Sequence, residues 1–326
     1  MRLRLSSCCF ALLAALTAPA FLGAQTETGS EGALFLLLPT GAQAVGMGQA
    51  MVASRPGSEA IWWNPSALAR QEKRELAIHH SKTLAGVGDA LSFVLPSQSF
   101  GTAALSLNIL NIGEQQVTDE QGQPIGVILP RDLVFAGTYA ARIGKNFNAG
   151  FNYKLVQFRV DCSGQCASVG TLTSTSSAAD IGAQYHFPTA TPLTIGFALR
   201  NFGSRLNSGN AGRSEPLPTQ LELGAMYRLG FIDRYLKDTE VRTAGSFVDS
   251  RSFGGRSLRV GADVIYQKTV HFRGGYVGED DRADASASLG FGLESGRFVF
   301  DFARTFGGLP ADDGQRPTYL SLRYLF

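Results

Sequence analysis

Hydrophobic and polar residues alternate through most of the chain from residue 74 to its end. This period of two is typical of β-strands that present one apolar and one polar face. Most of the alternating segments hold eight to twelve residues, near the ~9–11 residues that cross a bilayer at a tilt. The fourteen segments are residues 74–81, 88–96, 100–110, 132–142, 146–160, 176–187, 192–202, 219–230, 239–248, 256–267, 269–278, 285–295, 297–306 and 317–326. The pattern predicts an all-β fold, a fourteen-stranded antiparallel transmembrane barrel, because bacterial outer-membrane barrels have even strand numbers.

The two faces of these segments differ in charge. In the last segment, Leu320 and Leu322 share one face, and Ser321 and Arg323 share the other. An Arg or Lys on the lipid face costs roughly 2–4 kcal/mol at the bilayer midplane, so the charged face must line the lumen. The charges placed in the lumen are Asp180, Glu222, Asp263 and Asp301 together with Arg200, Arg228, Arg242, Arg259, Arg273 and Arg323. A lumen with both signs predicts a salt-bridged, plugged interior rather than an open, charge-selective pore.

Connections between the segments alternate in length. The short ones are residues 97–99, 143–145, 188–191, 268 and 296. The long ones are residues 111–131, 161–175, 203–218 and 307–316. Outer-membrane barrels have short periplasmic turns and longer extracellular loops, so the alternation assigns the two ends of the barrel. One exception, residues 231–238, is predicted to form a small periplasmic helix.

Residues 1–24 have the features of a signal peptide. Arg2 and Arg4 provide the positive start, and the apolar run that follows is too short to span a bilayer as a helix. Cleavage is predicted after Ala24, with Ala20 as the alternative. The chain is therefore expected to leave the cytoplasm and to reside in the outer membrane.

The composition of the mature chain agrees with a barrel. Without the two leader arginines the 29 basic residues fall to 27, equal to the 27 acidic ones, so no basic field favours nucleic acid as a partner. Charged residues make up 17% of the chain, and glycine accounts for 38 of its 326 residues. The charged share is below, and the glycine share above, the usual ~25% and ~7%. Both deviations are compatible with strands that face lipid.

Residues 25–73 lack the alternation and are predicted to form a plug, with the barrel over residues 74–326. Gly46 and Gly48 flank Met47, which indicates close backbone packing or positive φ angles. Later strands are expected to wrap around this compact segment.

The plug segment contains Trp62, Trp63, Asn64 and Pro65 in succession. A short helix that includes Trp62 must end at Asn64, because the residue before proline avoids the α region. A second short turn is predicted over residues 65–69, with Pro65 at its first position. The two tryptophans are expected to anchor the plug to the wall, and a ligand-stacking platform is the alternative.

Two cysteines, Cys162 and Cys166, lie in one predicted extracellular loop. A structural disulfide between them is expected in an oxidising compartment, whereas no His or acid stands at the spacing of a metal site. Phe326 ends the last alternating segment on an aromatic. This terminal residue is predicted to be the signal that the barrel-assembly machinery reads.

No enzymatic motif accompanies the barrel pattern. G-x-S-x-G, H-E-x-x-H and P-loop sequences are absent from the chain. His79 and His80 are adjacent and must point to opposite faces of a strand, so they cannot share one metal. His186 and His271 are expected to be isolated polar residues of the lumen. We therefore predict a protein without catalytic residues, metal or cofactor.

The plug motif resembles the N-terminal signature of a known family of outer-membrane barrels. G-A-x-A-x-G-M-G-x-A followed by W-N-P-[AS]-x-L-A resembles the PorV/PorQ family, which is related to the FadL transporters of hydrophobic compounds. The matching positions are Gly41, Ala42, Ala44, Gly46, Met47, Gly48, Ala50, Trp63, Asn64, Pro65 and Ala67–Ala69. The chain departs from the pattern at Gln49, where glycine is common, at Ser66, where alanine is common, and at residues 56–59, which replace an Asp pair.

The resemblance implies a non-enzymatic role in a type IX-like secretion system. Such barrels bind secreted cargo released from the translocon and pass it to a sortase-like attachment complex at the surface. The long connections 111–131, 161–175 and 203–218 would then form the partner surface. A FadL-like channel that takes up a hydrophobic small molecule is the alternative, and a structural barrel of another role is the third hypothesis.

Overall fold

The computed structural model describes residues 32–165, 172–189, 192–207, 214–232, 235–250, 255–279, 285–307 and 316–326. The predicted signal peptide, residues 1–24, and the predicted disulfide partner Cys166 lie outside these residues. Within the described ranges, no helix has the length and hydropathy needed to cross a bilayer.

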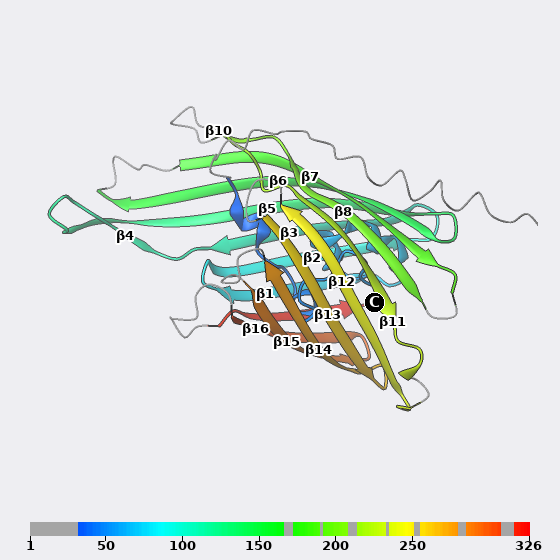
Figure 1. Ribbon diagram of the computed structural model, residues 1–326. Helices are drawn as coiled ribbons and strands as arrows, with labels where there is room; N and C mark the ends of the chain where they lie inside the picture. The colour runs from blue at the N-terminus through cyan, green and yellow to red at the C-terminus, as the bar shows by residue number, and fades with distance from the viewer. Residues whose placement is uncertain are drawn as a thin grey trace, which may run out of the picture.

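Fourteen long antiparallel strands form one closed sheet. Figure 1 shows how the strands wrap into a barrel. They are β1 Glu75–Thr83, β2 Gly86–Ser97, β3 Gly101–Asn111, β5 Pro124–Ile143, β6 Phe147–Gly164, β7 Leu172–Phe187, β8 Leu193–Gly203, β11 Gln220–Arg228, β12 Thr239–Ser250, β13 Gly255–Tyr266, β14 Val270–Glu279, β15 Ser286–Ser295, β16 Phe298–Gly307 and β17 Thr318–Leu325. The first and last strands close the ring, with Ile78 opposite Leu322. The predicted fourteen-stranded barrel is confirmed.

Three short strands add to the extracellular end: β4 Gln115–Thr118, β9 Leu206–Asn207 and β10 Ser214–Glu215. β4 pairs with β5. The prediction of a loop over residues 111–131 is therefore wrong for the residues of these two strands. β5 begins at Pro124 rather than at residue 132. Residues 125–129 form an unbroken apolar run without alternation, so only their pairing with neighbouring strands reveals them as β-structure.

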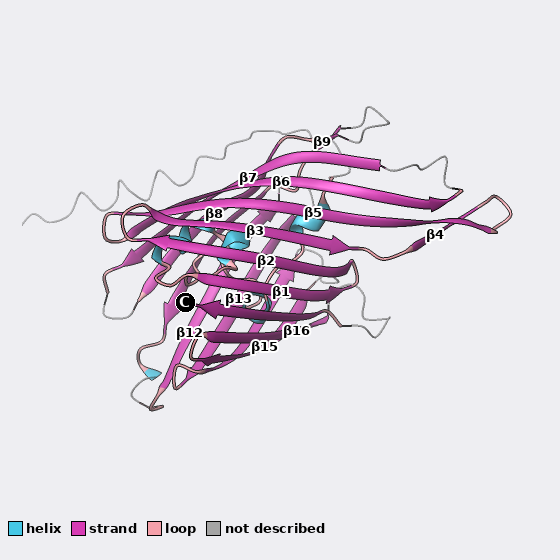
Figure 2. Cartoon of the chain, turned by 180° about the vertical axis from the view of Figure 1, so that it is seen from behind, coloured by secondary structure: helices cyan, strands magenta, loops and turns pink. Residues whose placement is uncertain are grey.

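The neighbouring strands are also longer than predicted. β6 continues to Gly164 and β7 begins at Leu172, which shortens the expected loop 161–175. Together β5, β6 and β7 extend beyond the other strands on one side of the barrel (Figure 2). On this side of the barrel, the described part of the extracellular rim is therefore a raised wall of strands.

Apolar side chains cover the outside of the barrel and polar ones its inside. Along β17, Leu320 and Leu322 are exposed, whereas Ser321 and Arg323 are buried. Phe326 lies on the outside, where its ring centroid is 5.5 Å from that of Tyr324. This separation agrees with the lipid-facing and lumen-facing sides expected of such a sheet.

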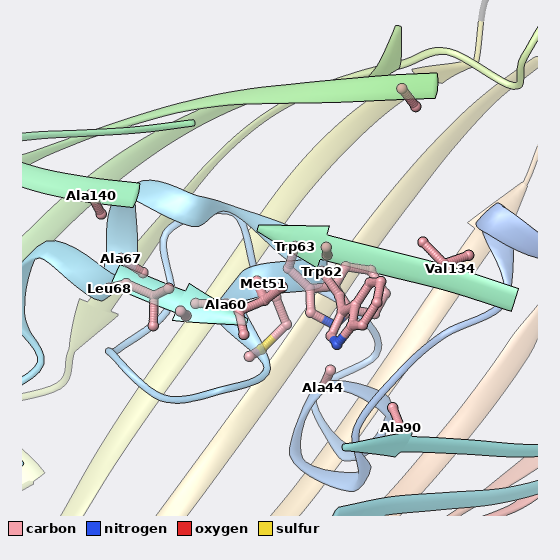
Figure 3. Close-up of a cluster of buried hydrophobic side chains, with 14 of the residues drawn as sticks. Ala44, Met51, Ala60, Trp62, Trp63, Ala67, Leu68, Ala90, Val134 and Ala140 are labelled. Atoms are coloured by element: carbon pink, nitrogen blue, oxygen red, sulfur yellow. The ribbon is translucent and has the colours of Figure 1, made fainter. Parts of the chain in front are cut away.

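The N-terminal segment lies inside the ring of strands, where Figure 2 shows its helices. It contains η2 Leu34–Leu37, α1 Ala42–Gly46, α2 Ala60–Trp63 and η3 Pro65–Arg70. α2 ends before Asn64, and η3 has Pro65 at its start. Figure 3 shows the buried cluster in which the plug side chains, among them Met51, Trp62 and Leu68, meet the small wall residues Ala90, Val134 and Ala140.

The segment 231–238, predicted as a periplasmic helix, is described only in part. Asp233 and Arg234 lie outside the described residues. Of the rest, Ile232 is in a 3-10 conformation and its carbonyl accepts from the backbone N–H of Leu236 at 3.0 Å, while residues 235–238 form turns and a bend. The structure therefore leaves that helix a prediction.

Candidate functional site

The first contact between plug and wall is made by Gly46, Met47 and Gly48. Gly48 has φ +57°, a left-handed conformation that glycine adopts without a steric penalty. A Cβ atom on Gly275 would collide with the backbone of Gly48, and one on Gly261 would collide with the carbonyl of Met47. The strands β13 and β14 thus bring their backbones against the plug because both sides lack side chains. We call this contact the GMG seat; it comprises Gly46, Met47 and Gly48 with Gly261, Gly275 and Gly290.

Asn64 makes the second contact, which we call the WNP seat; it comprises Trp63, Asn64 and Pro65 with Gly150, Gly182 and Gly196. The Asn64 side chain is fully buried. Its Nδ2 donates to the carbonyls of Val52 at 2.5 Å, Phe197 at 3.2 Å and Ala183 at 3.3 Å. Its Oδ1 accepts from the backbone N–H of Ser66 at 3.1 Å. One side chain therefore joins the plug turn to two wall strands.

Inward-facing glycines make room for this second contact. A Cβ on Gly182 would collide with Asn64 Oδ1, and one on Gly150 would collide with the carbonyl carbon of Pro65. A Cβ on Gly196 would collide with the carbonyl of Val52. The wall and the plug motif are thus matched at each point where the backbones approach.

The two tryptophans lie against wall cations. The guanidinium carbons of Arg200 and Arg259 are 5.0 Å and 5.6 Å from the ring centroid of Trp63, and Lys154 Nζ is 6.0 Å from that of Trp62. Trp63 Nε1 donates to the carbonyl of Thr40 at 3.0 Å. Cations within about 6 Å of an aromatic face attract it. Both tryptophans also line a small cavity between plug and wall, so an anchoring role and a ligand platform both stay predictions.

A buried ion network lies beside the GMG seat. Asp301, which is fully buried, accepts from Arg273 Nη1 at 2.5 Å and from Arg323 Nη2 at 2.9 Å. Arg273 also lies 3.4 Å from Asp263, whose carboxylate is 3.1 Å from His271 Nδ1. The structure thus brings four of the proposed lumen residues into one chain of charges.

His271 differs from its prediction. It was expected to be isolated, but its second ring nitrogen, Nε2, lies 3.1 Å from Glu294. Sequence spacing could not show this, because β13, β14 and β15 bring the three residues together across the sheet. Within the described part of the chain, no group of three His, Cys, Asp or Glu residues is arranged to hold a metal ion.

A second ion network lies beside the WNP seat. Lys154 Nζ is 2.7 Å from Asp180 and donates to Asn201 at 2.8 Å. Glu222 is fully buried and lies 3.6 Å from both Arg200 and Arg259. Each buried carboxylate thus has a cation from a neighbouring strand.

Arg228 and Arg242 take a different place from the other proposed lumen charges. The Arg228 side chain is 37% exposed at the periplasmic end and lies 3.9 Å from Glu240. Arg242 also contacts Glu240. These residues belong to the periplasmic mouth and not to the charge networks at the two seats.

Sequence reasoning missed two residues that hold the plug. Glu59 accepts from the backbone N–H groups of Gln43 at 3.1 Å and Ala44 at 2.7 Å, at the start of α1. Burial raises the pKa of the Glu59 carboxyl to about 7, against the opposing influence of Arg323. The plug has no regular strand or helix pattern from which the position of Glu59 could be predicted. Lys154 could have been predicted, because it is two residues from Asn152 in β6 and therefore faces the lumen as Asn152 does.

Two further predicted residues lie at the ends of strands. Cys162 lies near the extracellular end of β6 and is disulfide-bonded. Its pairing with Cys166 stays a prediction, because Cys166 is outside the described residues. The role of Phe326 in assembly also stays a prediction.

A mainly apolar cavity of about 440 Å³ opens at the extracellular end, between the start of the plug and the raised wall. Leu34, Phe35 and Leu38 line it from the plug, and Phe158 lines it from β6. Asp132 also lines it; this carboxyl is buried, and its Oδ1 has no hydrogen-bond partner among the described residues. The plug separates this cavity from the periplasmic mouth.

The chain is similar to known barrels in sequence and in fold. The family model of the type IX secretion system protein PorV matches residues 23–243. Among curated proteins, none matches the chain.

Several solved structures share its fold. The Pseudomonas putida toluene transporter TodX is 12% identical with a TM-score of 0.59, and the match covers 88% of this chain and 98% of TodX. The CymD monoaromatic hydrocarbon channel is 15% identical with a TM-score of 0.58, covering 91% and 99%. The Ralstonia pickettii toluene transporter TbuX is 14% identical with a TM-score of 0.56, covering 88% and 98%. At these identities the likeness shows a common barrel fold.

Proposed function

Since this chain belongs to the family of the type IX secretion system protein PorV, we propose that it binds secreted cargo or a surface-attachment complex at its extracellular end. The resemblance drawn from the plug motif is confirmed. The protein is an outer-membrane β-barrel of a non-enzymatic family with a FadL-like fold. As a component of a secretion system, the protein has partners within that system. We propose that these partners include secreted cargo or the attachment complex.

The extracellular cavity is the observation that supports docking. It combines an apolar lining from η2 and β6 with the unpartnered carboxyl of Asp132. A buried polar group without a partner costs free energy, and a donor supplied by a bound polypeptide would offset that cost. The raised wall of β5, β6 and β7 adds strand surface beside the cavity. The extracellular end therefore offers both apolar area and a polar point of recognition.

Gentle detergent purification from the native outer membrane, with mass spectrometry of everything that accompanies the barrel, tests this proposal. We expect secreted proteins that share one C-terminal domain, or a sortase-like protease. A barrel that purifies without such proteins under conditions that preserve other membrane complexes would contradict the proposal.

A pair of variants localises the contact. Leu34 is 40% exposed and lines the cavity, whereas Leu84, 65% exposed in the turn between β1 and β2, does not. Leu34→Gln should reduce the recovered partner several-fold, and Leu84→Gln should leave it unchanged. Equal recovery with both variants would place the docking surface elsewhere.

A channel for hydrophobic molecules is the second candidate, and the same cavity favours it. Its volume of about 440 Å³ suits a small apolar ligand. The structural neighbours named as toluene or monoaromatic channels share the fold. A lipid or hydrocarbon identified by mass spectrometry in a barrel that lacks protein partners would favour this function over docking.

The proposed layout of the chain completes this picture. Residues 1–24 would be removed as a leader, residues 25–73 would form the plug, and residues 74–326 would form the barrel that the assembly machinery inserts. The plug motif and the buried charges would keep the lumen closed while partners bind outside. The N-terminal residue of the mature protein, determined by mass spectrometry, checks the leader.

A further inference from the structure

A second cavity opens at the periplasmic end of the lumen, away from the proposed docking surface. It has a volume of about 210 Å³ and lies between plug residues 53–56 and the ends of β7, β8, β11 and β12. Its lining comes from the plug and from inward-facing positions of the wall. A ligand would therefore reach it from the periplasm rather than from the lipid.

Positive charge dominates the lining of this cavity. Arg55, Arg70, Arg228 and Arg242 line it, and Glu240 is the one acid among its described lining residues. Glu240 contacts Arg242 and lies 3.9 Å from Arg228. One carboxylate therefore offsets only part of the charge of four guanidinium groups.

Several donors of these arginines lack a partner within the described residues. Arg242 Nη1 and Arg70 Nε are buried without a hydrogen-bond acceptor. Arg55 is exposed and forms no hydrogen bond or ion pair with another described residue. Arg242 lies close enough to repel its charge, and the carboxylates of Glu294, Glu240 and Asp263 lie close enough to attract it. Like charges held together with unused donors favour the binding of an anion between them.

The rest of the lining restricts the kind of anion. Ala53, Pro56, Ala67, Pro192 and Met226 provide apolar walls beside the guanidinium groups. An acidic side chain carries methylene groups that such walls can contact, whereas inorganic phosphate is polar on all sides. Arginine forks also match the geometry of a carboxylate.

From this arrangement we propose that the periplasmic cavity binds an acidic side chain, Asp or Glu, of a periplasmic polypeptide. The site is independent of the proposed extracellular docking, because it lies at the opposite end of the barrel. Loss of one site would leave the other intact.

The test uses the full-length barrel in detergent and a fluorescein-labelled peptide, Gly-Ser-Glu-Glu-Glu-Gly-Ser. A peptide with Gln in place of each Glu is the matched control. We expect the acidic peptide to bind at least ten-fold more tightly than the Gln peptide, and its affinity to fall as salt rises. Equal binding of the two peptides, or full displacement by inorganic phosphate at an equal concentration, would overturn the proposal.

Two variants assign the binding to this cavity. Arg55→Gln removes a cation of the lining that forms no hydrogen bond or ion pair with another described residue, and we expect it to weaken peptide binding about ten-fold. Lys237→Gln removes an exposed cation from the same end of the barrel but outside the cavity, and it should leave binding unchanged. An equal effect of the two substitutions would mean attraction by the whole periplasmic face and would contradict a site. The gel-mobility shift on boiling confirms that both variants are folded.

Discussion

The GMG seat and the WNP seat hold the same plug by different chemistry. At the GMG seat, α1 lies against β14 to β17, and the nearest polar groups are ionised residues around Asp301. At the WNP seat, η3 lies against β5, β6 and β7. There the neutral amide of Asn64 bonds the wall directly, and the ion network of Lys154 and Glu222 lies beside it. Both seats use wall glycines for close approach. They differ in what happens when one partner is removed.

The two seats differ in how many groups can replace a lost partner. Asp301 is the carboxylate that both Arg273 and Arg323 contact, so its loss leaves two cations buried without it. Asn64 shares the carbonyl of Val52 with Gln184, which donates to it at 3.2 Å. The GMG seat should therefore be sensitive to single substitutions, whereas the WNP seat should lose stability gradually.

Asp301→Ala should have the largest effect. Removing one member of a buried ion network leaves uncompensated charge and costs about 3–5 kcal/mol. The temperature at which half of the barrel loses its folded gel mobility should therefore fall markedly. Asp89→Ala is the control, because Asp89 forms an exposed pair with His80 at 2.7 Å and such pairs contribute about 0–1 kcal/mol. Similar temperatures for the two variants would show that the Asp301 network does not stabilise the seat.

Gly275→Ala should have the next largest effect. Its Cβ would collide with the backbone of Gly48, which no side-chain rotation can relieve. Overpacking of this kind costs about 1–3 kcal/mol. Its neighbour provides the control: a Cβ on Gly274 would meet only Leu289 at 3.9 Å, so Gly274→Ala should leave the transition temperature almost unchanged.

Plug displacement can be measured in the same variants. Gly275→Ala should raise the conductance of the barrel in planar bilayers, because the turn at Gly48 must move away from the wall. If the Gly275→Ala barrel is destabilised but keeps the conductance of the wild type, the wall strand has moved to relieve the collision and the plug has stayed in place.

Asn64→Ala should have a smaller effect on stability. It removes the hydrogen bonds that Nδ2 donates to three carbonyls and those that Oδ1 accepts from the backbone N–H and the hydroxyl of Ser66. The carbonyls of Ala183 and Phe197 belong to paired strands and Val52 keeps Gln184 as a donor, so the buried Ser66 is the residue left without its acceptor. A net loss of about 1–2 kcal/mol follows, since a typical hydrogen bond contributes ~1 kcal/mol. The transition temperature of the Asn64→Ala barrel checks this, with Asn146→Ala in a periplasmic turn as the control. A fall as large as that of Asp301→Ala would refute the contrast between the seats.

The alternation of the strands was sufficient to predict the barrel and its inner face, because each strand must separate lipid from lumen. The plug motif likewise located both seats through Gly46, Gly48 and Asn64. The pairing of charges was not predictable, since Asp301 and its arginines come from β14, β16 and β17 and meet only when the register is fixed. Glu59 was missed because the irregular plug has no periodicity to show which way a side chain points.

Glu59→Gln should have the smallest effect and should appear mainly as a change in pH dependence. The pKa of Glu59 is raised to about 7 in the folded protein from an ordinary value of 4.5. A carboxyl with a raised folded pKa contributes stability that is fully present below its unfolded pKa and is lost as pH rises through its folded pKa. Between pH 6 and pH 8 the wild type should therefore lose about 1 kcal/mol of stability through this group. Glutamine cannot titrate and keeps one acceptor oxygen for α1, so the variant should show a flatter dependence of the transition temperature on pH. Parallel curves for the two proteins would mean that Glu59 stays ionised beside Arg323, and that the GMG seat depends on charge at the plug as well as at the wall.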